Sequence, residues 1–176
     1  MPRQRLDTNA DWPFLDEMPP ERVTEIRSVI ENLPFLALFG VRLKNVDRDR
    51  VALSVACGPK LTQPAGVIHG GVHATLIDTA VAHAIRTTLK EGYLFSTVQL
   101  DTKFFKPTSE GELVAEARIV RKGKSLVHAD ADVRNGAGEL VAKGWCIYAL
   151  RKISGARSDD VGPRDDAGPG TPTEEP

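Results

Sequence analysis

The sequence predicts an α+β fold in which one long apolar helix lies against an antiparallel β-sheet. Three observations predict it: a helical pattern from about residue 70 to 89, four alternating β-runs after it, and short glycine-containing links between those runs. A helix that is apolar over much of its circumference needs a sheet to cover it. The chain of 176 residues fits one folded domain.

Composition divides the chain into three segments. Residues 154–176 contain four Gly, four Pro and six acidic residues, which predicts a disordered tail. Residues 1–19 are polar and interrupted by prolines, so they form either a flexible segment or a strap that docks in an apolar groove through Trp12, Phe14, Leu15 and Met18. The folded domain is therefore expected at residues 20–153.

A short helix and a β-hairpin are predicted before the long helix. In residues 21–33 the apolar side chains recur three and four residues apart, and Pro34 ends the pattern. Residues 41–46 and 51–56 alternate on either side of the polar sequence DRDR, as in a hairpin. Residues 58–68 contain two Gly and two Pro and are predicted to be a loop.

The long helix and the β-runs after it supply the core. Apolar pairs recur every four residues in the helix, at Leu76-Ile77, Ala80-Val81 and Ala84-Ile85. The β-runs are expected at about 94–105, 112–121, 124–134 and 139–150. Small residues recur on one face of the middle runs, which leaves space for the helix. Because the links are short, we expect these four strands to form an antiparallel meander.

Composition and charge exclude several classes of protein. Lys and Arg total 23 and Asp and Glu total 24, so no broad basic face for nucleic acid is expected. No apolar run is long enough for a membrane span, and the first residues lack the apolar region of a secretory signal, which predicts a cytoplasmic location without membrane contact. Cys57 and Cys146 lie far apart and are interpreted as small buried side chains.

A candidate site lies where the long helix begins, at Gly70 and Gly71. The first turn of a helix has unpaired N–H groups and partial positive charge, which suit an anion or a developing oxyanion. Two glycines allow close approach to the backbone, although a simple tight turn is the plain alternative. Within the same helix, Asp78 interrupts an apolar stretch and is a candidate base or nucleophile. The alternative is a solvated or capped acid at a helix edge.

The spacing of these groups favours a site shared by two subunits without a metal. Asp78 lies about 10 Å beyond Gly71 along the helix, so one helix cannot apply both groups to one carbonyl. His69 and His73 lack the Glu of HExxH, and Asp78 is rotated about 140° from His73, so no metal site is predicted. His69 is expected to orient the helix start by hydrogen bonding. No GxSxG motif, P-loop or nucleophilic Cys arrangement is present.

These residues resemble those of the hotdog-fold acyl-CoA thioesterases of the PaaI type. The resemblance covers residues 35–150 and rests on the pattern G-x-x-HGG-x-x-A-x-x-x-D from Gly66 to Asp78, together with TVQLDTKFFKP, RKGKS and GELVA further on. It implies a long central helix wrapped by a curved antiparallel sheet, in homodimers that often pair into tetramers. It implies no cofactor.

The resemblance also implies roles for individual residues. The Gly70 amide would polarise the thioester carbonyl, Asp78 of the partner chain would activate water or attack, and His69 and Gly71 belong to the helix start that receives the substrate. Thr97 would position the water or the acid. Gln63 stands where many members carry Asn. Basic residues near strand ends could bind the phosphates of coenzyme A, or form a solvated rim: Lys103, Lys106, Arg121, Lys122 and Lys124.

The sequence therefore predicts an acyl-CoA thioesterase for a small or medium acyl group, possibly an aromatic one. One alternative is a hotdog hydratase or dehydratase acting on β-hydroxyacyl thioesters, whose catalytic His and carboxylate usually have another spacing. The other is a non-catalytic module that binds acyl-CoA or an acyl carrier protein, which the departure at Gln63 keeps open.

Overall fold

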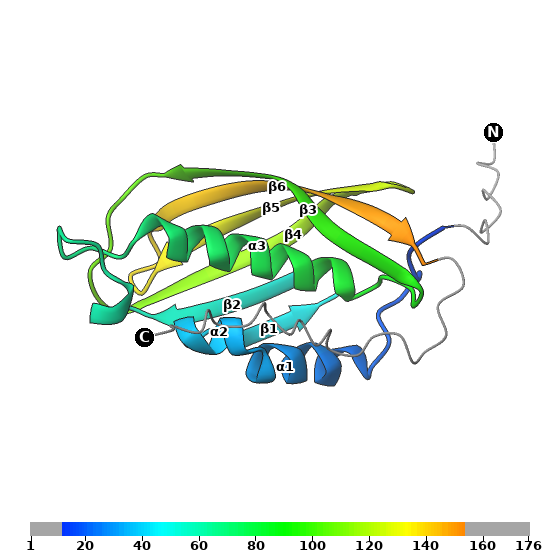
Figure 1. Ribbon diagram of the computed structural model, residues 1–176, viewed down its shortest axis with the longest axis horizontal. Coiled ribbons are helices and arrows are strands. Elements are labelled where there is room, and N and C mark those ends of the chain that lie inside the picture. The colour runs from blue at the N-terminus through cyan, green and yellow to red at the C-terminus, as the bar shows by residue number, and fades with distance from the viewer. Residues whose placement is uncertain (1–11, 154–176) are drawn as a thin grey trace, which may run out of the picture.

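The computed structural model describes residues 12–153, in which the longest helix packs against a curved sheet (Figure 1). The helices are α1 (Arg22–Asn32), α2 (Pro34–Phe39) and α3 (Gly70–Arg86), with a 3-10 turn at Pro59–Leu61. The strands are β1 (Arg42–Asp47), β2 (Arg50–Ala56), β3 (Tyr93–Phe104), β4 (Glu112–Lys122), β5 (Leu126–Asn135) and β6 (Leu140–Lys152). All neighbouring strands are antiparallel, which confirms the predicted α+β fold.

The order of strands corrects the prediction of a four-stranded meander. The sheet runs β1-β2-β4-β5-β6-β3, so only β4, β5 and β6 form a meander, while β3 pairs with β6 at the far edge. The link of residues 105–111 is no tight turn. It is attached to other segments, because the Ile68 N–H donates to the Thr108 carbonyl and the Cys57 N–H donates to the Gly111 carbonyl. These bonds lead the chain from β3 to a place beside β2.

Alternation in the strands places small residues under α3, as predicted. Ala115 and Ala117 of β4 and Ala129 and Ala131 of β5 are fully or almost fully buried. On β6, a Cβ at Gly144 would overlap the Cγ2 methyl of Ile77 and lie 3.0 Å from its Cδ1. The helix and the sheet therefore approach each other so closely that this position has no room for a side chain.

The first part of the chain differs in detail from the prediction. Pro34 not only ends α1 but also opens α2, since proline suits the first turn of a helix. Helix α2 ends at Gly40, whose φ of 67° is left-handed. Before α1, the Phe14 side chain is 2% exposed and its residue forms a β-bridge with Leu89. The rest of the predicted N-terminal segment, residues 1–11, and the predicted tail, residues 154–176, lie outside the described residues.

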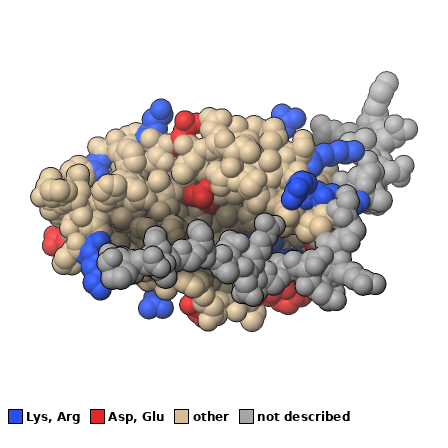
Figure 2. Space-filling view, viewed as in Figure 1, with Lys and Arg blue, Asp and Glu red and all other residues tan. Residues whose placement is uncertain are grey.

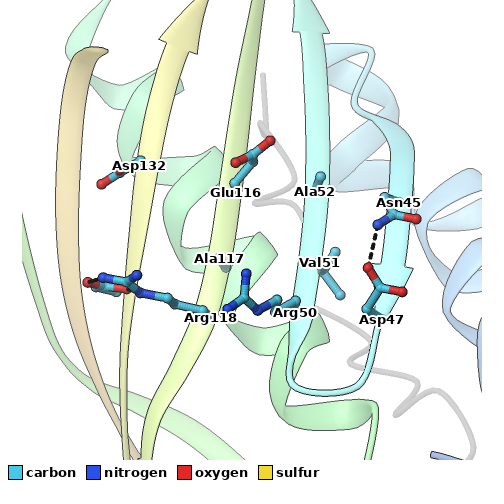
Figure 3. A pocket seen from close by; sticks show the side chains of 10 residues that line it. Asn45, Asp47, Arg50, Val51, Ala52, Glu116, Ala117, Arg118 and Asp132 are labelled. Carbon is cyan, nitrogen blue, oxygen red and sulfur yellow. Dashed lines mark hydrogen bonds and ion pairs between the residues drawn. The ribbon is translucent and has the colours of Figure 1, made fainter.

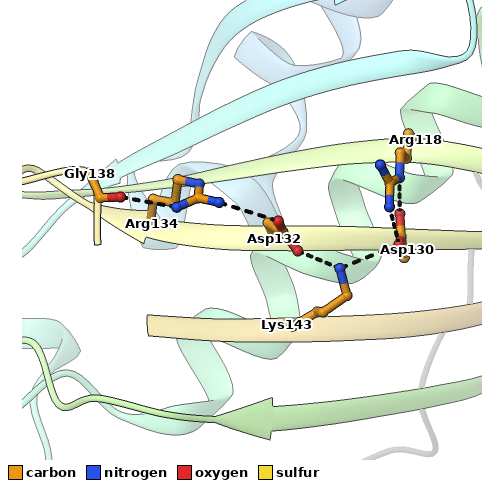
Figure 4. A network of polar contacts seen from close by, with 6 residues as sticks. All are labelled: Arg118, Asp130, Asp132, Arg134, Gly138 and Lys143. Atoms are coloured by element: carbon orange, nitrogen blue, oxygen red, sulfur yellow. Dashed lines mark hydrogen bonds and ion pairs between the residues drawn. The ribbon is translucent and has the colours of Figure 1, made fainter. Parts of the chain in front are cut away.

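The outer face of the sheet, which points away from α3, carries a network of cross-strand ion pairs (Figure 4). Arg118 makes two hydrogen bonds to Asp130, of 2.7 and 2.8 Å, and Lys143 lies 3.4 Å from Asp130 and 2.6 Å from Asp132. Arg134 extends the network to Asp132 at 3.5 Å. Each cation therefore has a carboxylate partner on the same or a neighbouring strand.

Candidate active site

The start of α3 leaves one backbone amide free. The Nδ1 atom of His69 accepts a hydrogen bond of 2.9 Å from the Gly71 N–H, and the Val72 N–H donates to the His69 carbonyl. Within residues 12–153, the Gly70 N–H has no hydrogen-bond acceptor. His69 thus caps the helix and fixes its first turn, while the Gly70 amide stays available to a ligand.

The free amide lies in an apolar pocket. Gly70 and Gln63 line this pocket together with Phe104 and Phe105, and the ring of Phe104 would be 3.3 Å from a Cβ at Gly70. His73 also lines it and is 4% exposed, so burial lowers its pKa below the ordinary value. The pocket can therefore hold an apolar group beside an amide donor.

The carboxylate of Asp78 is held by two hydroxyl groups. The Thr97 hydroxyl of β3 donates to Oδ1 at 2.9 Å. The Tyr148 hydroxyl of β6 lies 2.6 Å from the same oxygen and 2.8 Å from the Asp78 carbonyl, and can donate to either. No described residue donates to Oδ2. One carboxylate oxygen is thus fixed and the other remains available.

Tyr148 is a residue of the candidate site that the sequence analysis missed. It is 2% exposed, and burial, with the hydrogen bond to the Asp78 carboxylate, raises its pKa well above the ordinary value. The hydroxyl therefore remains protonated and acts as a donor. In the sequence, the signal for Tyr148 is a side chain with a polar hydroxyl at a position of β6 that points toward the core. The pairing of Tyr148 with Thr97 between β6 and β3 then assigns it to the candidate site.

A β-bulge lets β3 serve both ends of the candidate site. Thr97 and Phe104 are an odd number of residues apart, so a regular strand would point them to opposite faces. The pairing shifts between Thr97 and Gln99, which makes Val98 an extra residue. Because of this bulge, the hydroxyl of Thr97 reaches Asp78 and the ring of Phe104 covers Gly70, both on the side of α3.

Within one chain, Asp78 and Gly70 do not meet. They lie eight residues apart on α3, about 12 Å along its axis. The geometry agrees with the sequence argument that the amide and the carboxylate of one chain cannot act on one carbonyl group.

The predicted phosphate-binding residues are spread over two ends of the molecule. Lys103 is exposed on β3, while Arg121 and Lys124 are exposed at the turn between β4 and β5. The Lys122 side chain is 14% exposed and lies 2.5 Å from Asp49 and 2.7 Å from the Thr88 hydroxyl, so its charge has an internal partner. Thr88 follows the end of α3, so Lys122 lies far from Gly70.

A hollow on the outer face of the sheet is not joined to this site (Figure 3). It is lined by charged residues of four strands, among them Asp47, Arg50, Arg118 and Asp130. Arg118 and Asp130 satisfy each other there, as described above. The free amide of Gly70 and the carboxylate of Asp78 are both on the other side of the sheet.

Solved structures define the class of protein to which this fold belongs. A thioesterase from Haemophilus influenzae superposes with a TM-score of 0.70 at 19% identity, over 75% of this chain and 92% of that chain. A thioesterase family protein from Silicibacter pomeroyi gives a TM-score of 0.68 at 25% identity, over 74% of this chain and 98% of the other. The fold is the hotdog fold of thioester hydrolases.

Sequence comparison gives the family. The model of the thioesterase superfamily matches residues 65–142, which include the start of α3, Asp78 and Thr97. A protein of Saccharolobus solfataricus named "Putative esterase" is 30% identical over 131 residues, 72% of this chain and 85% of its own length. Acyl-coenzyme A thioesterase 13 of Mus musculus is 27% identical over 70% of this chain and 91% of its own length. The chain belongs to the thioesterase superfamily.

In the described part of the chain, no helix is both long and apolar enough to cross a membrane.

Proposed function

We propose that this protein hydrolyses the thioester bond of small or medium acyl-CoA molecules, aromatic ones included, in the manner of the PaaI-type thioesterases. The observation that carries the proposal is the Asp78 carboxylate, whose Oδ1 is held by Thr97 and Tyr148 while Oδ2 has no donor in the described chain. A carboxylate oriented in this way can take a proton from water or attack a carbonyl carbon.

The Gly70 amide supplies the second part of the chemistry. Attack on a thioester places negative charge on the carbonyl oxygen, and an unpaired N–H at a helix start stabilises that charge. The aromatic rings of Phe104 and Phe105 line the same pocket but are more than half exposed, so a second copy that covers them would exclude water and strengthen the hydrogen bond. Gln63 lines the pocket and has an amide group that can hold the substrate or the water.

We propose that a second copy of the chain completes the site. The side of α3 that carries Asp78 is only half buried and is formed by small residues: Ala74, Thr75, Thr79 and Ala82. Strand β3 is an edge of the sheet and exposes Val98, Leu100 and Phe104 by 57, 36 and 57%. Small residues on a helix and apolar side chains on a free edge favour contact with another copy, which brings Asp78 to the partner's Gly70.

In the proposed reaction, Asp78 removes a proton from water while the water oxygen bonds to the carbonyl carbon. The carbon–sulfur bond then breaks, and coenzyme A leaves and receives the proton. Direct attack by Oδ2 would instead give an acyl anhydride that water hydrolyses. A single turnover in H2(18)O tests direct attack, because label in Asp78 requires an anhydride whose aspartyl carbon is attacked by water, and trapping of the anhydride with hydroxylamine covers attack on the acyl carbon.

The first test is Asp78→Asn, assayed by thiol release from a panel of aromatic, short and long acyl-CoAs. We expect kcat to fall at least about 100-fold, because a general base is lost. Asp101→Asn removes an exposed carboxylate from β3 and should keep the wild-type rate. A rate within a few fold of wild type in folded Asp78→Asn would remove this residue from the mechanism. Binding of acyl-CoA by the wild type without turnover would favour the binding-module alternative.

A further inference from the structure

A second pocket lies at the far end of α3 and is rich in cations. Its lining includes Arg22 of α1, Arg86 of α3, and Lys90 and Glu91 of the loop that follows, with Tyr93 and Phe95 of β3 as an apolar wall. On the face drawn in Figure 2, one group of Lys and Arg side chains lies near the end of the molecule at which α3 ends, and others lie at the opposite end. We call this pocket the end pocket.

The cations of the end pocket are incompletely paired. Arg22 is 15% exposed in its side chain and pairs with Glu25 at 3.1 Å, but its buried Nε has no hydrogen-bond partner in the described chain. Arg86 is half buried and makes no hydrogen bond or ion pair with a described residue. Burial and the nearby Arg22 guanidinium lower the pKa of Arg86, and the carboxylate of Glu25 opposes them only in part.

A structural role explains only part of this arrangement. A cation near the last turn of a helix interacts favourably with the helix dipole, and Arg86 alone would be enough for that. It does not explain why Arg22 and Lys90 line the same hollow, where three cations outnumber the carboxylates of Glu91 and the nearby Glu25. An anionic ligand would offset the excess positive charge and accept hydrogen bonds from the unpaired guanidinium of Arg86.

The end pocket lies beside the residues that hold Asp78. The ring of Phe95 lies 5.9 Å from the ring of Tyr148, whose hydroxyl holds Asp78. On α3, the half-buried face that carries Asp78 continues through Ala82 to Arg86, about 12 Å further along the axis. The pantetheine arm of coenzyme A separates its phosphates from the thioester by a long chain, so a phosphate site should lie apart from Asp78.

We propose that the end pocket binds the phosphate groups of the coenzyme A leaving group through Arg86, Arg22 and Lys90, an inference that rests on the proposed function. The wall of Tyr93 and Phe95 suits the flat adenine ring. This assignment differs from the one based on Lys122, because Lys122 already pairs with Asp49 while Arg86 has no such partner.

The kinetic test uses the full chain and two substrates that share one acyl group, an acyl-CoA and the corresponding acyl-pantetheine, which has no phosphate. In Arg86→Gln we expect KM for the acyl-CoA to rise about 10-fold at unchanged kcat, with kcat/KM for the acyl-pantetheine unchanged. Arg86→Lys should restore part of the loss. Arg134→Gln, which removes a cation from the outer face, should behave as wild type. Equal effects on both substrates, or no effect on either, would overturn the proposal.

A binding test separates this inference from the proposed function. By calorimetry, adenosine 3′,5′-bisphosphate should bind the wild type and bind Arg86→Gln about 10-fold more weakly, even if no acyl-CoA is hydrolysed. Inorganic phosphate that binds as tightly as the nucleotide would indicate a general anion site and overturn the assignment to coenzyme A. Thermal unfolding checks that each variant folds, and Lys90→Gln replaces Arg86→Gln if that variant does not.

Discussion

On the outer face of the sheet, cross-strand ion pairs join Arg118, Asp130 and Lys143, whereas α3 buries two histidines that have no such partners. Both ring nitrogens of His73 and the Nδ1 of His83 lack hydrogen bonds within residues 12–153. The members of this ion-pair network keep their charged forms because each has a neighbour of opposite sign. Under the sheet, burial penalises the charged forms of His73, His83 and Tyr148, so it lowers the pKa of the two histidines and raises that of the tyrosine. The two faces of the sheet thus differ: the outer face carries paired charges, and the inner face buries uncharged histidines.

The largest expected effect tests how tightly the layer between helix and sheet is packed. Gly144→Ala should destabilise the protein by about 3 kcal/mol, because the added methyl group overlaps the Cγ2 atom of Ile77. Gly136→Ala is the matched control, since its Cβ would lie 3.9 Å from the nearest atom, the Glu112 nitrogen. Urea unfolding of both variants measures the difference. Equal stability of the two would mean that α3 can move away from β6.

The next effect concerns the buried histidines and appears on acidification. Burial, with repulsion from Arg86, lowers the pKa of His83 to about 4. The unfolded chain therefore binds a proton near pH 6.5 that the folded chain does not bind, and stability falls between pH 6.5 and 4. At pH 5 the loss from His83 amounts to about 2 kcal/mol.

Substitution of His83 isolates this contribution. His83→Gln should lose less stability than the wild type between pH 7 and 5 in urea unfolding. His128→Gln, which removes a histidine from the outer face, serves as the control and should follow the wild-type profile. If His83→Gln has the same pH profile as the wild type, buried neutral histidine is not the source of acid sensitivity.

The smallest expected effect on stability comes from an ion pair on the outer face of the sheet, and it appears at a lower pH. Burial alone would raise the pKa of Asp130, but hydrogen bonds and charge from Arg118 and Lys143 outweigh it and lower the pKa. Ionised Asp130 therefore stabilises the fold above about pH 4, and this contribution is lost as the pH falls through the lowered value. Asp130→Asn should cost about 1 kcal/mol at pH 7 and progressively less as the pH falls from 4 to 2. A constant difference across this range would indicate lost packing.

Local patterns in the sequence were sufficient for the elements and for part of the site. The glycines at the start of α3, the acid inside it and the small residues beneath it are all visible as spacing along the chain. Long-range pairing was not visible. Tyr148 is 70 residues from Asp78, and a meander that placed β3 beside β4 could not bring it opposite Thr97. The same error concealed the partner of Lys122, because Asp49 comes near it only when β4 lies beside β2.

Because Val98 is an extra residue in β3, the function depends on the number of residues in this strand as well as on their identity. Deleting it would restore regular pairing and turn either the Thr97 hydroxyl or the Phe104 ring to the opposite face of the sheet. A homologue with the same motifs but one residue fewer between these two positions would therefore lack one half of this arrangement. Assigning a relative to this activity from its sequence requires the spacing in β3 to be counted.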